Sequence, residues 1–142
     1  MLKTLFLSIS ISGLPLAASA QSSGDAQNGA DLFAGQCTAC HVVATPDGNV
    51  LAGRNAKVGP NLYGVAGRSL GSVEDFRYSR ALNDAGDLGL TWTEGNFVGF
   101  VQDPTGWLRE ELDDSRARGR MSYQVRDPGH AVDIYAFLES LQ

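Results

Sequence analysis

The chain contains few of the side chains that bind metals or form disulfides, with two cysteines and two histidines among its 142 residues. A structural zinc site needs four ligands, and it would have to combine Cys37, Cys40 and His41 with His130, which is distant in sequence. A thioredoxin-like redox pair would need a βαβ pattern around the cysteines, and the sequence has none. Both kinds of site are disfavoured, so the closely spaced cysteines need another explanation.

Basic residues are scarce as well. Acidic residues number 16 and basic residues 11, the formal net charge is −5, and Lys57 is the only lysine after Lys3. This balance argues against non-specific nucleic-acid binding. No repeat, low-complexity tract or second long apolar segment is present.

The N-terminal residues differ in composition from the rest. Lys3 precedes an apolar stretch over residues 5–16, and Ala18-Ser19-Ala20 fits a signal peptidase site. The stretch is shorter than the roughly 20 apolar residues that span a bilayer as a helix, which disfavours a retained membrane anchor. The pattern predicts a secretory signal peptide over residues 1–20, followed by a single domain over residues 21–142.

The remaining sequence predicts an all-α fold with much loop. Asp25 can cap a helix that runs to about Cys37, and residues 72–85 favour a short helix or turns. Thr91 can cap a helix that ends before Pro104. Asp127 can cap a last helix whose first residue is a proline. We expect loops over residues 41–71, which are rich in glycine, proline, asparagine and aspartate, and over the charged residues 109–120.

Cys37 and Cys40 are followed directly by His41, which completes the C-x-x-C-H pattern of c-type haem attachment. Two thiols at this spacing can reach the two vinyl groups on one edge of a haem, and the adjacent histidine is then carried over the iron. Thioether bonds cannot be reduced as a disulfide can, so they join cofactor and core as a covalent staple. The motif predicts one covalent haem c.

Met121 is the only methionine left once the predicted signal peptide is removed. A lone methionine is usually a gap-filler in the core, but polar residues and no helical apolar stripe surround this one. His130 is the rival, although it is more typical of a solvated surface residue. The sequence favours His41 and Met121 as the two iron ligands. This pair would raise the reduction potential and leave no site for a substrate, so we expect electron transfer rather than catalysis.

The sequence resembles the class I cytochromes c, and more narrowly the c2-type periplasmic cytochromes of purple bacteria. Beyond C-x-x-C-H, the resemblance rests on short motifs in a shared order: Gly59-Pro60-Asn61-Leu62-Tyr63-Gly64, Gly67-Arg68, Phe76 with Tyr78-Ser79, Thr91-Trp92, Asp103-Pro104 and Ala136-Phe137-Leu138. It implies the cytochrome c fold, in which the N- and C-terminal helices cross and loops wrap around one haem.

The resemblance also implies roles for particular residues. The Pro60 carbonyl would accept a hydrogen bond from the His41 ring and orient it. Arg68, Tyr78 and Trp92 would bind the haem propionates, which need donors; a plain aromatic core is the alternative for the tyrosine and the tryptophan. At the helix crossing, small and aromatic residues would pack together: Gly29, Phe33, Ile134 and Phe137.

Two features depart from the family pattern. The family usually has a tyrosine that contacts the methionine ligand eight residues after its tryptophan, where this chain has Phe100. The lysine ring around the haem edge is also missing. Arginines near Met121 are a possible replacement that would attract an acidic partner, with ordinary solvated charges as the alternative: Arg116, Arg118, Arg120 and Arg126.

The resemblance implies a soluble, monomeric periplasmic carrier, not an enzyme, that moves electrons from a cytochrome bc1-type complex to a photosynthetic reaction centre or a terminal oxidase. Two alternatives stay open. One is a dedicated electron-accepting subunit of a periplasmic dehydrogenase, and the other is a haem peroxidase or gas sensor with an open iron site.

Overall fold

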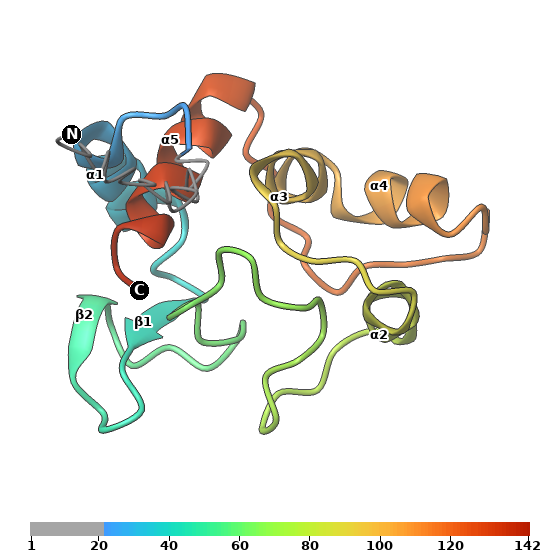
Figure 1. Cartoon of the computed structure of the whole chain (residues 1–142), viewed down its shortest axis with the longest axis horizontal. Helices are drawn as coiled ribbons and strands as arrows, with labels where there is room; N and C mark the ends of the chain where they lie inside the picture. The colour runs from blue at the N-terminus through green and yellow to red at the C-terminus, as the bar shows by residue number, and fades with distance from the viewer. Residues whose placement is uncertain (1–21) are drawn as a thin grey trace, which may run out of the picture.

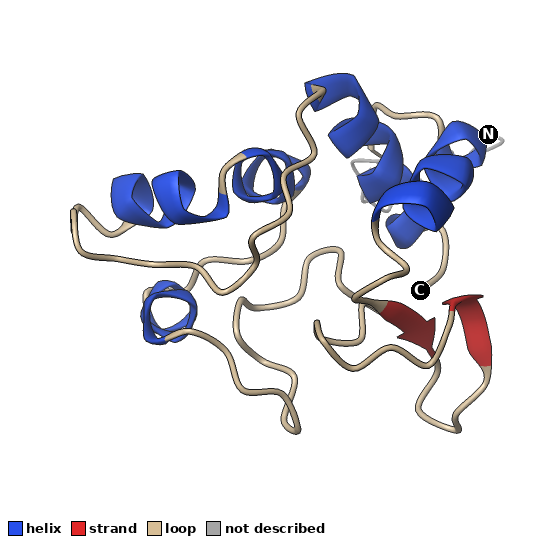
Figure 2. Ribbon diagram, turned by 180° about the vertical axis from the view of Figure 1, so that it is seen from behind, coloured by secondary structure: helices blue, strands red, loops and turns tan. Residues whose placement is uncertain are grey.

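A computed structural model of the protein describes residues 22–142, so the predicted signal peptide over residues 1–20 lies outside the described residues. The described chain forms five helices and one two-stranded sheet (Figures 1 and 2). In chain order they are α1 (Ala26–Gln36), β1 (Val42–Ala44), β2 (Val50–Gly53), α2 (Arg80–Asp87), α3 (Glu94–Gln102), α4 (Pro104–Glu111) and α5 (Pro128–Glu139). None of these helices has the length and apolar character needed to cross a membrane.

The first and last helices begin where the sequence predicts. The Asp25 carboxylate accepts hydrogen bonds from the main-chain N–H groups of the first turn of α1, and Asp127 does the same for α5. Pro128 fits the first position of α5, because that position needs no N–H donor.

Helices α1 and α5 pack closely against each other (Figure 1). A Cβ atom on Gly29 would overlap the main-chain carbonyl of Asp133, so only glycine permits this approach. Next to it, the rings of Phe33 and Phe137 lie 5.5 Å apart, and Ile134 is buried in the same core. The Asp133 carboxylate accepts hydrogen bonds from Asp25 N–H and Asn28 Nδ2, which lowers the pKa of Asp133 and ties the two helices together.

The start of α3 and the presence of α4 differ from the prediction. Helix α3 is capped by the hydroxyl of Thr93 rather than Thr91, which instead forms a short bridge with Ser69. Helix α3 ends at Gln102, before Pro104, as predicted. The difference is that the Asp103 carboxylate caps a further helix, α4, whose first residue is Pro104. Helix α4 therefore covers the beginning of the stretch over 109–120 that we expected to be irregular.

The segment predicted as loop, residues 41–71, contains a small antiparallel hairpin made of β1 and β2. Its turn requires a glycine at Gly48, where φ is +87°. The strands are three and four residues long, too short for a clear alternation of apolar and polar residues. The chain from Arg54 to Ser79 is otherwise irregular, and α2 occupies only part of the predicted range and continues beyond it.

Aromatic side chains form the core beneath α3 and α4. The Trp92 ring contacts Phe100 edge-on at 5.1 Å and stacks on Trp107 at 6.4 Å. The Tyr135 hydroxyl of α5 donates to the Trp92 carbonyl at 2.9 Å. This cluster connects the C-terminal helix to the middle of the chain.

Replacing Gly29 with alanine should lower the free energy of unfolding by about 1–3 kcal/mol, because the added methyl group forces α1 and α5 apart. Gly95→Ala in α3 is the control, since nothing lies within 4 Å of the added Cβ atom. It should leave stability unchanged or increase it slightly. Denaturant unfolding of both purified variants measures the difference, and equal stability of the two would contradict the close crossing.

Candidate functional site

A cavity of about 320 Å³ lies between the helices and the irregular segments, within the range of roughly 300–1,000 Å³ that is common for ligand sites. Its walls come from the end of α1, the chain over 58–82, Trp92 with α3, residues 120–125, and α5. Beyond α4 the chain turns back and runs past α3 to α5, which brings residues 120–125 to this place (Figure 2). All eight predicted site residues line the cavity: Cys37, Cys40, His41, Pro60, Arg68, Tyr78, Trp92 and Met121.

The two cysteines and the histidine follow the last turn of α1. Cys37 N–H closes the helix by donating to the Phe33 carbonyl, and the N–H groups of Cys40 and His41 both donate to the Cys37 carbonyl. This tight turn places all three side chains along one cavity. No disulfide joins the two cysteines. Burial raises the pKa of the Cys37 thiol to about 12, with Cys40 adding to the shift.

The His41 ring is held from two sides. Its Nδ1 lies 2.9 Å from the Pro60 carbonyl oxygen, so Nδ1–H is the donor and Nε2 keeps its lone pair. Gly59 lies against the ring so closely that any Cβ atom there would overlap it. Burial lowers the pKa of His41, although the bond to Pro60 opposes this, and a neutral imidazole is the form that binds a metal.

Arg68 organises the loop that carries Pro60. Its Nη1 donates to the Tyr63 carbonyl at 2.7 Å and its Nη2 to the Asn61 carbonyl at 3.2 Å. Its Nε is buried without any partner, and burial lowers the pKa of the guanidinium. A buried, unpaired donor on a cavity-lining cation is the arrangement that a bound carboxylate would satisfy. A group with carboxylate substituents, such as haem, fits this wall.

Met121 packs against the core at the edge of the cavity. Phe100 lines the same cavity and is only 8% exposed, because it packs edge-on against both Trp92 and Trp107. Its ring has no hydroxyl, so it can donate no hydrogen bond to the Met121 sulfur.

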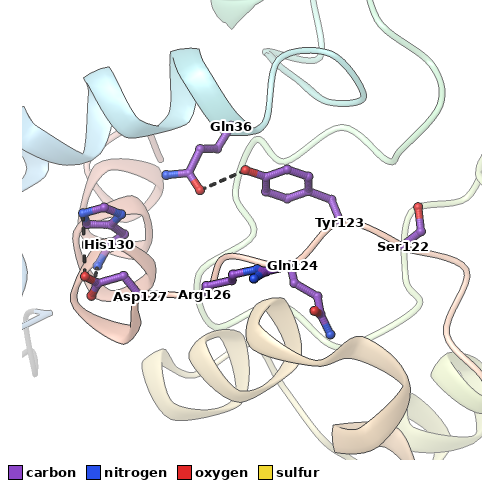
Figure 3. A pocket seen from close by; sticks show the side chains of 7 residues that line it. All are labelled: Gln36, Ser122, Tyr123, Gln124, Arg126, Asp127 and His130. Carbon is purple, nitrogen blue, oxygen red and sulfur yellow. Dashed lines mark hydrogen bonds and ion pairs between the residues drawn. The ribbon is translucent and has the colours of Figure 1, made fainter.

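His130, the rival ligand, lies elsewhere. Its side chain is 46% exposed and sits 3.9 Å from the Asp127 carboxylate. It lines a hollow of about 500 Å³ that adjoins the cavity, since both are lined by Gln36 and Tyr123. Figure 3 shows His130 in this hollow. Residues 22–142 contain no group of three or more His, Cys, Asp or Glu side chains that could hold a metal ion.

The sequence alone missed contacts that depend on distant segments. Gly59 belongs to a recognised motif, but nothing in the sequence predicts its contact with the His41 ring. The same is true of the Arg120 guanidinium, whose Nη1 donates to the Arg77 carbonyl at 2.8 Å across 43 residues of chain.

Comparison with known proteins gives relatives that match most of the chain. Cytochrome c2 from Rhodovulum adriaticum is 59% identical over 119 residues, which cover 84% of this chain and 94% of the relative. Cytochrome c2 from Cereibacter sphaeroides is 44% identical over 119 residues, which cover 83% and 95%. The crystal structure of cytochrome c2 from Rhodobacter sphaeroides matches with a TM-score of 0.81 at 44% identity, covering 84% of this chain and 97% of that one. No protein-family model matches the chain.

The chain therefore belongs to the c2-type cytochromes, within the class I cytochromes c. The predicted fold class is confirmed. Proteins of this family are electron carriers with one covalent haem c, and Cys37 and Cys40 of the C-x-x-C-H motif are the attachment residues in this chain.

Replacing Arg68 with glutamine should lower the free energy of unfolding by about 1–3 kcal/mol, because the carbonyls of Asn61 and Tyr63 lose a charged donor. Arg80→Gln is the matched control: its ion pair with Asp84 is exposed, and its loss should cost less than about 1 kcal/mol. Denaturant titration of the haem-loaded proteins tests this, and equal effects of the two substitutions would refute the role of Arg68.

Proposed function

We propose that this protein is a diffusible periplasmic carrier of single electrons whose haem iron is bound by His41 and Met121. The observation that carries the proposal is that the Met121 side chain lines the same cavity as the His41 ring, whereas His130 does not. Haem iron supplies one-electron redox chemistry, and a His/Met pair raises its potential. Because His41 and Met121 would together leave the iron no open position for a substrate, we infer a carrier and not an enzyme.

The protein's own residues prepare the site for this role. Pro60 accepts the Nδ1–H proton of His41, which fixes the tautomer and makes Nε2 a better electron donor. Apolar side chains such as Leu82, Val101 and Leu138 line the cavity and exclude water. Arg68, Tyr78 and Trp92 would hold the propionates at the polar wall.

Because Phe100 offers no hydrogen bond, the Met121 sulfur would be held only by packing and by the iron. The sulfur then keeps its full donor capacity for the iron.

We further propose that the donor is a cytochrome bc1-type complex and the acceptor a photosynthetic reaction centre or a terminal oxidase. A cleaved signal peptide over residues 1–20 and action as a monomer in the periplasm belong to the same proposal. Its support is the likeness to c2-type cytochromes over more than four fifths of the chain.

The net negative charge of the chain also agrees with the alternative function, a dedicated electron-accepting subunit of a periplasmic dehydrogenase. Co-purification with one dehydrogenase, or turnover with that enzyme alone, would favour the subunit over the shuttle.

Met121→Ala tests the ligand set directly. The oxidised wild-type protein should show the weak charge-transfer absorption of an iron–thioether bond, and the reduced protein should not bind carbon monoxide. The variant should lose that absorption and bind carbon monoxide, because the iron would lack its Met121 ligand while both cysteines would still hold the haem. His130→Ala is the control and should behave as the wild type. Carbon monoxide binding by the wild type would instead favour the open-site peroxidase or gas sensor.

The arginines near Met121 are the proposed steering charges for an acidic partner. Arg116 is partly neutralised, since its Nε lies 3.5 Å from Asp114, and Arg120 is engaged with Arg77. Arg118 is exposed and forms no side-chain hydrogen bond or ion pair within the described part of the chain, which makes it the cleaner test of charge alone.

Arg118→Gln should slow association with the redox partner about twofold at low salt, with the difference vanishing at high salt. Arg54→Gln carries the same charge change directly after β2, and Figure 1 shows β2 on the side of the molecule opposite to the chain that leaves α4. It should therefore have less effect. Stopped-flow kinetics over a salt series measures the association rate of each variant. If the rates of the two variants depend on salt concentration in the same way, steering by the arginines is excluded.

A further inference from the structure

The segment that carries Met121 has few bonds of its own. No main-chain hydrogen bond joins residues 120–124 to any other part of the chain over 22–142. The segment belongs to no helix or strand. Its position over the cavity therefore depends on the contacts that flank it and on its side chains.

The flanking contacts fix the two ends of the segment. Before it, Gly119 N–H donates to the Thr105 hydroxyl at 3.1 Å, which attaches this end to α4. After it, Val125 N–H donates to the Val101 carbonyl of α3 at 2.8 Å. The Tyr123 hydroxyl also donates to Gln36 Oε1 at the end of α1, at 3.2 Å (Figure 3). None of these contacts reaches the wall that carries Tyr78.

One side chain makes that connection. Arg120 Nη1 donates to the main-chain carbonyl of Arg77 at 2.8 Å. Arg77 directly precedes Tyr78, and Tyr78, Arg120 and Met121 all line the cavity. The guanidinium thus joins the residue next to Met121 to the loop that carries Tyr78.

We propose that Arg120 is a positioning residue that holds Met121 over the cavity by donating to the Arg77 carbonyl, and so resists displacement of the thioether by an external ligand. The inference rests on the proposed role of Met121 as an iron ligand. A charged donor forms a stronger hydrogen bond than a neutral one. The site is exposed, so water competes for both partners, and the expected effect is modest.

The test is imidazole binding to the purified, oxidised haem protein, followed by visible absorption. Imidazole competes with the thioether for the iron, so its apparent affinity reports how readily Met121 leaves. Arg120→Met keeps most of the side-chain stem and removes the donor, and it should bind imidazole about fivefold more tightly, as expected for the loss of one hydrogen bond. Arg120→Lys retains a donor and should stay close to the wild type.

Two control variants separate the hydrogen bond from the charge. Arg118→Met removes the same charge two residues away, and Arg77→Met leaves the accepting main-chain carbonyl in place. Both should bind imidazole within twofold of the wild type. If Arg120→Met binds imidazole no more tightly than Arg118→Met, or if Arg120→Lys binds it as tightly as Arg120→Met, the inference is wrong.

The same spectra separate this failure from failure of the ligand assignment. A wild-type protein without the iron–thioether absorption would overturn Met121 as a ligand. A wild type with that absorption, combined with equal imidazole affinity in Arg120→Met and Arg118→Met, would overturn only the role of Arg120.

Discussion

The close contact between α1 and α5 is the constraint on which the rest of the structure depends. Gly29 lets the two helix backbones approach, and the last turn of α1 then leads directly to Cys37. From the other side, α5 supplies Ile134 and Leu138 to the cavity. A helix pair held this firmly gives fixed support to segments that have little regular structure of their own.

The irregular segments are organised by side chains as well as by main-chain hydrogen bonds, such as those that join Gly67 and Arg68 to Trp92. Arg68 donates to two carbonyls of the loop that carries Pro60, and the Pro60 carbonyl in turn orients His41. The cavity measures about 320 Å³ and many of its walls are apolar. Protein interiors are closely packed, and apolar side chains that face no partner lose their contacts. The haem therefore forms part of the core of this small protein.

The site is asymmetric in the way its two proposed iron ligands are supported. His41 is fixed by a hydrogen bond and by contact with Gly59. Met121 lies on a segment held by its ends and by the side chains of Arg120 and Tyr123, with Phe100 offering no hydroxyl. The His41 ring is therefore held firmly by contacts inside the protein. The position of Met121 depends on exposed side-chain contacts, for which water competes.

The sequence by itself determined the cofactor, its attachment residues and the two terminal helices, because each depends on residues close together in the chain: the C-x-x-C-H motif and the caps Asp25 and Asp127. Local patterns misplaced the start of α3 and missed α4, since Thr91 and Thr93 are equally able to cap a helix and Pro104 can end one helix or begin another. The sequence did not predict the short hairpin, because its strands are too short to show an alternation of apolar and polar residues. Only the tertiary structure decided that His130 lies away from the cavity and that Arg120 reaches Arg77, because both depend on how segments far apart in sequence pack together.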